Sequence, residues 1–410
     1  MNARVVAWHL LRETRILTRR AVLRAVRDAD LQPRDRSLLV HILGAELRRR
    51  TALRAIAEHY AERRLRPDVA LFAHIGLAQL LFLDDVPDHA AISETVESAR
   101  TALGERPSAA VNALLRRVQR EVRRGASGDV RRDVPVADIH FEQAVFADPV
   151  AHWLLWAEQA LSLPVPIGRR WRNRLGAETA EGLARSMIEP PDVSLLVLRG
   201  EVGLVAQELA DSSPRPSAHP RMLLFPAASL RTVRASDALR RGDAVLLGEA
   251  LVRAAELVGA APGERVIELR ARMRSPNPAL AQSGADVVLH GLESAPTTGF
   301  DAAFLAAPSS DTGILGARPQ ARWRFDAARS AALATAQVSL LTRAAAAVRS
   351  GGRLVYATRS IEPDENQRRI RAFLATEPEW SLAAEIESLP AVRGASGPVD
   401  GGYAARLERR

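Results

Sequence analysis

Two adjacent hydroxyl side chains, Ser309 and Ser310, directly follow an apolar run and a proline, where catalytic groups are often found. The surrounding stretch reads FLAAPSSDTGILGARPQARW, with a glycine turn followed by basic and aromatic residues. A serine becomes a nucleophile only when a neighbouring base takes its proton. This stretch contains no histidine, and the nearest one before it is His290. The pair is therefore an unusual nucleophile, the remnant of a site, or only a turn.

Charged side chains follow two other apolar runs of the same region. Glu268 lies near the end of the run ERVIEL, and Arg359 lies in the run RLVYATRS. Helical patterns alternate with these runs, which is typical of a parallel sheet with helices on both faces. Ligands of such sheets bind at the carboxyl ends of the strands, so we expect residues 268–274, 307–311 and 358–361 to meet at that edge of the sheet. Because a guanidinium is a donor-only cation, Arg359 cannot act as a nucleophile there.

Four regions of the chain must position these residues. Residues 1–125 carry apolar side chains at helical spacing between prolines, which predicts an all-α bundle. Residues 126–147 lack this period and contain Gly, Ser and Pro, so we interpret them as a linker. Residues 148–245 mix a helical pattern with strand-like runs, which predicts a small α+β module. Over residues 246–410 strand and helix patterns alternate, which predicts an α/β domain.

The composition excludes several classes of site. The chain has no cysteine, which removes disulfides, thiolate metal ligands and thiol nucleophiles, and we expect no metal site. Its basic residues are all arginine, its net charge is +9, and the excess is concentrated in the first third of the chain. This asymmetry favours a polyanion such as RNA as the partner. No apolar run reaches membrane-spanning length and the N-terminal segment does not resemble a signal peptide, so we expect no membrane association and a cytoplasmic protein.

One helical segment separates charge from apolar surface clearly. In PSAAVNALLRRVQREVRR, residues 107–124, the apolar side chains follow one line and the arginines fall on the opposite arc. Guanidinium groups spaced in this way could contact RNA phosphates, although a charge run is also typical of an ordinary solvated face. Farther along the chain, the stretch RPQARW combines cations with an aromatic ring that could stack on a base. The predicted RNA-contact residues are Arg48, Arg49, Arg50, Arg116, Arg117, Arg120, Arg322 and Trp323.

These motifs resemble the bacterial ribosomal-RNA cytosine-5 methyltransferases that carry a NusB-like N-terminal domain, the RsmB/Sun/Fmu family. The resemblance covers essentially the whole chain. It implies a NusB-like helical domain that handles RNA, a Rossmann-like domain that uses S-adenosylmethionine, and ribosomal RNA as the substrate. The matching stretches are RDRSLLVHILGAELRRR, IGLAQLLFLDDVPDHAAISETVE, VNALLRRV, FDAAFLAAPSSDTGILGARPQARW, GGRLVYATRSIEPDENQ and DGGYAARL.

The same resemblance identifies catalytic groups that this chain lacks. In the family, a cysteine in a Thr-Cys-Ser motif adds to C6 of cytosine, and C5 then takes the methyl group. A second cysteine, in a Pro-Cys-Ser motif, helps to release the enzyme. In this chain Arg359 and Ser309 occupy these two positions, and Ala306 stands where the family has an aspartate. We therefore interpret Ser309 as a turn residue in the place of a lost thiol.

The cofactor turn also departs from the family pattern. The family has a Gly-Gly-Lys turn after the first strand, whereas this chain has Arg270, Arg272, Arg274 and two prolines. Bulky side chains there would obstruct the close backbone approach that a cofactor needs. Glu268 is the remaining candidate for a cofactor contact. A strand–helix–strand unit takes roughly 30 residues, so residues 266–305 are too few for four strands with their crossovers, and we expect a truncated domain.

These observations predict an RNA-binding protein of this family that has lost methyl transfer. Ribosomal RNA is the expected ligand, and we expect that S-adenosylmethionine does not bind. Two alternatives stay open. One is an active S-adenosylmethionine-dependent RNA methyltransferase that uses an atypical route. The other is a protein-interaction module in which the NusB-like bundle binds a protein partner.

Overall fold

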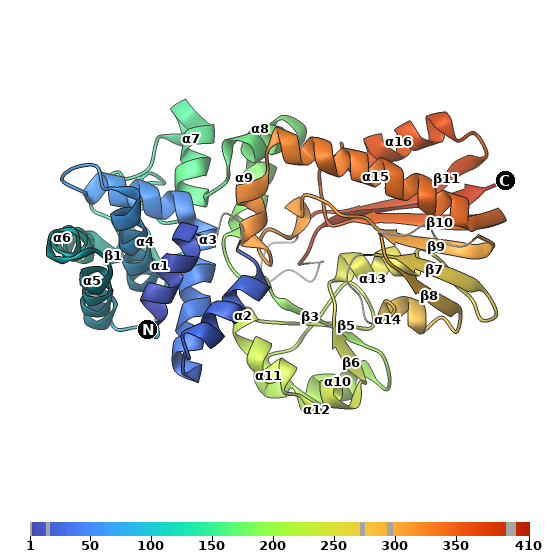
Figure 1. Cartoon of the computed structure of the whole chain (residues 1–410), viewed down its shortest axis with the longest axis horizontal. Helices are drawn as coiled ribbons and strands as arrows, with labels where there is room; N and C mark the ends of the chain where they lie inside the picture. The colour runs from blue at the N-terminus through green and yellow to red at the C-terminus, as the bar shows by residue number, and fades with distance from the viewer. Residues whose placement is uncertain (1, 14–16, 271–274, 293–297, 391–398) are drawn as a thin grey trace. The chain divides into compact units, whose positions relative to one another are not determined.

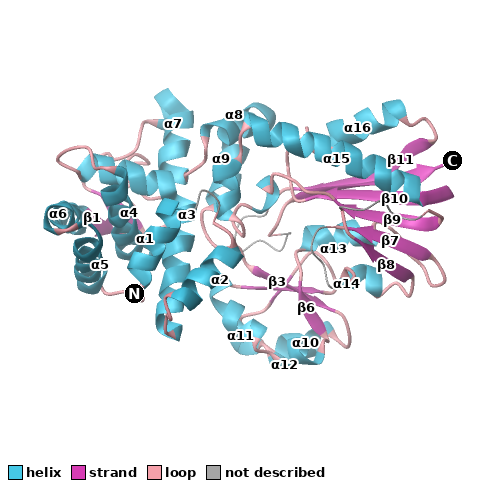
Figure 2. Ribbon diagram, in the orientation of Figure 1, coloured by secondary structure: helices cyan, strands magenta, loops and turns pink. Residues whose placement is uncertain are grey.

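The computed structural model describes residues 2–13, 17–270, 275–292, 298–390 and 399–410. The chain forms two units, which Figures 1 and 2 show by chain position and by secondary structure. One unit consists of residues 1–189 with residues 322–324, and the other of residues 190–321 with residues 325–410. Among the described helices, none is long and apolar enough to cross a membrane.

The first unit contains the predicted all-α bundle, and prolines begin several of its helices. α3, α4 and α7 each have a proline in the first turn, where a missing N–H leaves no helical hydrogen bond unmade. α3 packs against α4, α6 and α7. The helices are α1 (Ala3–Glu13), α2 (Arg19–Asp28), α3 (Pro33–Tyr60), α4 (Pro67–Phe82), α5 (Asp88–Leu103), α6 (Glu105–Glu121), α7 (Pro149–Leu161), α8 (Val165–Leu175) and α9 (Ala177–Met187).

The segment that we interpreted as a linker, residues 126–147, is packed rather than extended. Strand β1 (Val122–Arg124) pairs antiparallel with β2 (Ile139–Phe141) across it. The side chain of Val134 within the segment is buried, and Trp156 Nε1 donates to the carbonyl oxygen of Val130 at 3.2 Å. A hairpin of this kind has no helical period, which is why the sequence pattern alone resembles that of a linker.

The region predicted as one α+β module, residues 148–245, is divided between the two units. Helices α7–α9 belong to the first unit, and α7 buries Trp153 and Trp156. The strands that follow belong to the second unit. A helical pattern identifies the apolar face of a helix but not the element that covers it, so the sequence alone cannot place this boundary.

The second unit contains a mixed six-stranded sheet in the order β11-β12-β10-β9-β7-β8. β7 to β10 run parallel, and β12 pairs antiparallel with both β10 and β11. Figure 1 shows α15 and α16 on one face of the sheet and α13 and α14 on the other, which confirms the predicted α/β architecture. The elements are α13 (Glu249–Glu256), β7 (Arg265–Leu269), α14 (Pro278–Ala281), β8 (Asp286–His290), β9 (Phe300–Ala306), α15 (Ala327–Ala347), β10 (Val348–Thr358), α16 (Gln367–Thr376), β11 (Trp380–Ser388) and β12 (Gly402–Arg409).

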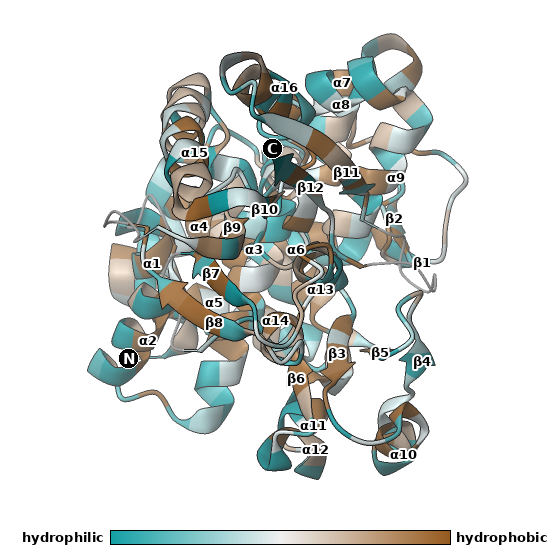
Figure 3. Cartoon of the chain, turned by 90° about the vertical axis from the view of Figure 1, so that its right-hand side faces the viewer, coloured by the Kyte–Doolittle hydropathy of each residue, from teal (hydrophilic) through white to brown (hydrophobic). Residues whose placement is uncertain are grey.

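Alternate side chains of the parallel strands enter two hydrophobic cores on opposite faces of this sheet. Ile267 and Leu269 pack with side chains of α15, whereas Val266 packs with side chains of α13. β8 is hydrophobic over most of its length in Figure 3. Among the described residues no strand pairs with the outer edge of β8, which is consistent with the expected truncation.

A smaller antiparallel sheet in the order β4-β5-β3-β6 precedes this domain in the second unit. Three short helices cover one face, and on the other face Leu196 and Met222 pack against Val252 of α13. The elements of this part are β3 (Val193–Val197), α10 (Val202–Glu208), β4 (Arg215–Pro216), β5 (Met222–Phe225), α11 (Leu230–Arg234), α12 (Asp237–Arg241) and β6 (Ala244–Leu246).

Candidate functional site

The loops that follow β9 and β10 meet, as the sequence predicts, and hydroxyl groups join them. The Oγ atoms of Ser310 and Ser360 lie 3.1 Å apart, and Thr312 Oγ1 lies 3.1 Å from Ser360 Oγ. The backbone N–H of Ile361 donates to Thr312 Oγ1 at 3.1 Å. All four residues are buried. The protein's own hydrogen bonds therefore fill the space between these two strand ends.

The carboxylate of Glu365 anchors this hydroxyl network. One carboxylate oxygen accepts from the N–H of Ser310 at 2.8 Å and from Nε2 of Gln337 at 3.1 Å. The other accepts from Ser360 Oγ at 3.0 Å. Because both oxygens accept from neutral donors of the protein, Glu365 holds the two loops together. Glu365 lies in the stretch IEPDENQ, and the sequence alone assigns no role to it.

Ser309 has no neighbour that would activate it as a nucleophile. Its side chain is 6% exposed, and its Oγ has no hydrogen-bond partner among the residues that the structure describes. A serine nucleophile needs a base at a distance of about 3 Å. The geometry therefore favours the interpretation of Ser309 as a turn residue.

Arg359 is paired with a buried carboxylate. Its Nη2 lies 3.1 Å from Oδ1 of Asp311, and Arg318 Nη1 donates to the other carboxylate oxygen at 3.1 Å. Burial lowers the pKa of Arg359, and the charge of Asp311 opposes that effect. The loop beside this pair is tight, since a Cβ atom at Gly313 would lie 2.4 Å from the carbonyl oxygen of Gly401. The arrangement holds a cation in place and supplies no attacking atom.

Glu268, the candidate cofactor contact, is held within the chain by one hydrogen bond and one ion pair. Its side chain is fully buried, with one oxygen accepting from the N–H of Asn277 at 2.7 Å and the other 2.6 Å from Nε of Arg270. Burial raises the pKa of Glu268, which the N–H of Asn277 and the charge of Arg270 oppose. Arg272 and Arg274 lie outside the described residues. Among the described residues of this turn, the carboxylate that the sequence offers as a cofactor contact therefore already has partners within the chain.

The predicted amphipathic segment is helix α6, and the side chains that are buried lie on the apolar face that the sequence predicts. Its buried apolar residues include Val111 and Leu115, whereas Arg116 and Arg120 are exposed. Arg117 is partly buried, with its guanidinium carbon 5.8 Å from the ring centroid of Tyr60. Exposed arginines on this face are accessible to an anionic ligand, and their role as RNA contacts stays a prediction.

The run Arg48, Arg49 and Arg50 does not lie on an open surface, which revises its predicted role. Arg49 is 4% exposed and donates to the carbonyl oxygen of Pro135 at 3.0 Å. Arg50 makes two hydrogen bonds of 2.8 Å to the carboxylate of buried Glu46. Burial lowers the pKa of both Arg48 and Arg49 to about 10. Arg49 is enclosed by the fold and Arg48 and Arg50 are only partly exposed, so these side chains contribute to the packing of the helical unit.

The predicted RNA-contact residue Arg322 is also internal. It is 3% exposed and belongs to the helical unit. Its guanidinium donates to the carbonyl oxygens of Arg48, Ser162 and Met187 at 3.0, 3.1 and 2.8 Å. Trp323 Nε1 donates to the carbonyl oxygen of Leu47 at 2.8 Å. Since RNA cannot reach a guanidinium that is enclosed in this way, we do not retain Arg322 as an RNA contact.

Each acceptor of Arg322 lies at a helix end or break. α3 is interrupted at Arg49 (φ −123°, ψ 19°), α7 ends at a left-handed Ser162, and α9 ends at Met187. Carbonyl groups at helix C-termini lack intrahelical partners and carry partial negative charge, so they favour a cation. The interruption of α3 also leaves the N–H of Ala52 to donate to Ser162 Oγ at 3.1 Å. Arg322 therefore acts as a shared C-terminal cap for three helices.

A partly buried carboxylate of the unit that holds the six-stranded sheet, that of Asp400, yields a pH prediction. Burial raises the pKa of Asp400 to about 6 from an ordinary 3.8, the N–H of Ala250 opposes this, and the charge of Glu249 adds to it. The folded state therefore keeps a proton that the unfolded state loses in this interval, so stability falls as pH rises from 3.8 to about 6. We expect Asp400→Asn to remove that fall and to leave the variant more stable than wild type at pH 7 by about 1 to 2 kcal/mol.

Thermal unfolding of both proteins between pH 4 and pH 7 checks this expectation. The exposed Asp286 provides the control, because Asp286→Asn should leave the pH profile unchanged. Parallel profiles for wild type and Asp400→Asn would contradict the assignment.

Comparison with known proteins places the chain in a family. A model of the 16S rRNA methyltransferases RsmB/F matches residues 274–394, and a model of the NusB family matches residues 1–120. A ribosomal RNA small subunit methyltransferase B from Xanthomonas campestris is 31% identical over 367 residues, with 83% of this chain and 80% of that protein covered. A probable ribosomal RNA small subunit methyltransferase B from Synechocystis is 26% identical, with 93% and 90% covered.

Solved structures show the same fold. The crystal structure of PH0851 matches with a TM-score of 0.70 and 19% identity, covering 100% of this chain and 99% of that one. A methyltransferase homolog from Pyrococcus horikoshii matches with a TM-score of 0.52 and 16% identity, covering 63% of this chain and 99% of that one. Together with the Xanthomonas relative, which is similar over most of both sequences, these matches confirm the resemblance seen in the motifs. The chain belongs to the RsmB/F family of 16S ribosomal RNA methyltransferases, with a NusB-family domain at its N-terminus.

Proposed function

We propose that this chain is an RNA-binding member of the RsmB/F family that does not transfer methyl groups, with ribosomal RNA as its ligand. The observation that carries the proposal is Arg359, which stands at the position of the family's nucleophile and pairs with Asp311 in a chain without cysteine. A guanidinium has no lone pair available to add to C6 of cytosine. Ser309 lacks a base and does not replace the missing thiol.

The contacts of Glu268 support the loss of cofactor binding. Arg270 and the N–H of Asn277 already hold its carboxylate, and both Glu268 and Arg270 are less than a tenth exposed. A ligand that used this carboxylate would have to break a buried ion pair, and breaking such a pair costs about 3 to 5 kcal/mol. We therefore infer that S-adenosylmethionine does not bind at the end of β7.

Charge and family membership support RNA binding. The curated relatives are named as ribosomal RNA small subunit methyltransferases, and the N-terminal third matches the NusB family. The chain has a net charge of +9, with the excess in that same third. Electrostatic attraction to phosphates supplies most of non-specific RNA affinity, so this distribution favours RNA over a protein as the ligand of the helical unit.

Two measurements test the proposal. In the first, the protein is incubated with transcribed 16S ribosomal RNA and tritiated S-adenosylmethionine, with the Xanthomonas relative as the positive control. We expect no tritium in the RNA and no heat on titration with S-adenosylmethionine, but retention of the RNA in a filter-binding assay. Formation of 5-methylcytosine would overturn the proposal, and failure to retain RNA would favour a protein-interaction module.

A double variant tests the proposed loss of cofactor binding separately from the loss of the thiols. We expect Arg359→Cys combined with Ser309→Cys to remain inactive, because the cysteines restore the thiols but leave the Glu268–Arg270 pair in place. Methyl transfer by this double variant would show that the cofactor still binds and would overturn that half of the proposal.

A further inference from the structure

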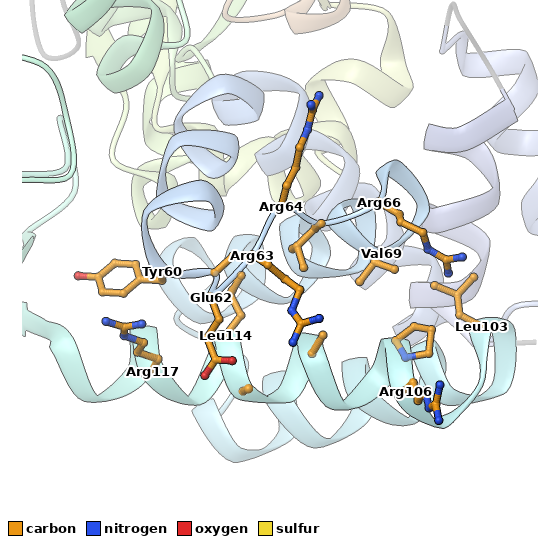
Figure 4. A pocket seen from close by; sticks show the side chains of 15 residues that line it. Tyr60, Glu62, Arg63, Arg64, Arg66, Val69, Leu103, Arg106, Leu114 and Arg117 are labelled. Atoms are coloured by element: carbon orange, nitrogen blue, oxygen red, sulfur yellow. The ribbon is translucent and has the colours of Figure 1, made fainter.

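The segment that joins α3 to α4 forms one wall of a groove in the helical unit. The groove has a volume of about 730 Å³ and lies between residues 61–66, the end of α5 and residues 106–117 of α6. Figure 4 shows Tyr60 and Arg117 at one end of the groove and Arg66 and Arg106 at the other. On its other side the same segment borders a second hollow of about 440 Å³, which Arg54 and His74 help to line.

The charge of this groove is strongly positive. Five arginines and one carboxylate, that of Glu62, line it. Within the described part of the chain, no carboxylate forms an ion pair with Arg63, Arg64 or Arg106. All three are exposed. This contrasts with Arg50, whose charge is met by Glu46. The groove therefore offers guanidinium groups that the protein itself does not neutralise.

The floor of the groove is apolar. Leu103, Pro107 and Leu114 contribute to it, and the arginines stand around it. Tyr60 is 1% exposed and its hydroxyl oxygen has no hydrogen-bond partner among the described residues. Burial raises the pKa of Tyr60 to about 12, so the hydroxyl keeps its proton and remains a donor. An apolar floor with cations around it matches a ligand that has flat apolar rings joined by anionic groups.

We propose that this groove binds a short stretch of single-stranded RNA, with phosphates on Arg63, Arg64 and Arg106 and a base against the apolar floor. The inference rests on the proposed function, since it names the surface through which the chain would bind RNA. Guanidinium groups bind phosphates in a bidentate manner and stack on bases. Bases reach an apolar floor only when they are unpaired, because a duplex presents its phosphates and riboses outward. An acidic peptide would use the arginines but not the floor.

Charge reversal tests the arginines. Fluorescence anisotropy of a labelled 12-nucleotide single-stranded RNA measures binding by wild type and by the double variant Arg63→Glu/Arg64→Glu. Each phosphate contact adds about 0.7 to the slope of log affinity against log salt for a single strand. We therefore expect the double variant to bind at least about tenfold more weakly and to lose about 1.4 from that slope. The control is Arg24→Glu/Arg27→Glu, which reverses two exposed arginines of α2 and should change affinity less than about twofold.

A second pair of variants tests whether the RNA occupies the groove, without changing any arginine. Ala109 and Ala110 are adjacent exposed residues of α6, and of these Ala110 lines the groove. We expect Ala110→Glu to weaken RNA binding about as strongly as the double reversal, and Ala109→Glu to have little effect. Both positions are exposed, so circular dichroism and thermal unfolding should show that all variants fold.

The outcomes distinguish the groove from the proposed function. If wild type binds RNA and the groove variants bind it equally well, the groove inference is wrong while RNA binding stands. If wild type binds no RNA, the proposed function fails. Equal affinity for a duplex of the same length would overturn the single-strand assignment, and displacement of the RNA by polyglutamate at equal charge would overturn RNA as the occupant.

Discussion

Replacing Arg322 with methionine is expected to destabilise the helical unit by about 3 to 5 kcal/mol, a large part of the stability of a typical domain. The guanidinium donates to the carbonyl oxygens of Arg48, Ser162 and Met187, which belong to three different helices. Methionine fills a similar volume but donates nothing, so three buried carbonyl groups would lose their partner. Each such loss costs about 1 to 3 kcal/mol, reduced where water can enter.

Hydrogen exchange gives a local test of this expectation. We expect the amides in the last turns of α7 and α9, and those around Arg49 in α3, to exchange faster in Arg322→Met than in wild type. The matched control is Arg329→Met, because Arg329 is only partly buried and lies outside the helical unit. If Arg322→Met unfolds at the same denaturant concentration as Arg329→Met, the shared cap contributes nothing and the burial of Arg322 needs another explanation.

Replacing Glu46 with glutamine is expected to lower the free energy of unfolding at pH 7 by about 3 kcal/mol. Burial opposes the ionisation of this carboxyl, but the charge of Arg50 and the contacts with Arg50 and His74 outweigh it and lower the pKa of Glu46 to about 2. Arg50 makes two hydrogen bonds of 2.8 Å to it, and His74 Nδ1 lies 3.7 Å from it. Without the carboxylate, the partly buried Arg50 would have no counter-charge.

The pH dependence of this variant provides a second readout. Because the folded-state pKa of Glu46 lies below its ordinary 4.5, the carboxylate contributes stability that is complete above pH 4.5 and is lost as pH falls toward 2. The difference between wild type and Glu46→Gln should therefore shrink over that interval. Glu58→Gln, an exposed carboxyl of the same helix, is the control. A difference that is absent at pH 7, or that persists unchanged at pH 2, would contradict the prediction.

These two sites explain why the helical unit retains residues whose sequence pattern favours RNA binding. Arg50 pairs with Glu46 and lies over the ring of Trp323, with its guanidinium carbon 5.3 Å from the ring centroid. Trp323 and Arg322 in turn bond to the chain around the break in α3. Residues that are distant in sequence thus form one packed cluster.

The candidate site of the α/β domain could be predicted in outline but not in its contacts. The order of strand and helix patterns indicates that the loops after β9 and β10 meet, since parallel strands end at one edge. The sequence also shows directly that Ser309 and Arg359 stand at the two positions where the family has cysteines. The partner of Arg359 could not be predicted, because Asp311 reaches it only through a tight turn with a left-handed backbone (φ 62°). Glu365 likewise could not be recognised as the anchor of the hydroxyl network, because Ser310 and Gln337, which donate to it, are distant from it in the sequence.

What the sequence by itself determined is the family, the fold class, the absence of thiol chemistry and the exposed arginine face of α6. These properties depend on residue types and on periodicity within one segment, which are local. Only the tertiary structure decided which arginines are available to a ligand. The runs Arg48–Arg50 and Arg63–Arg64 are similar as sequence, yet the first lies at a helix break inside the unit and the second is exposed beside a groove. The physical reason is that a charge is enclosed or exposed by elements distant in sequence, which no local pattern encodes.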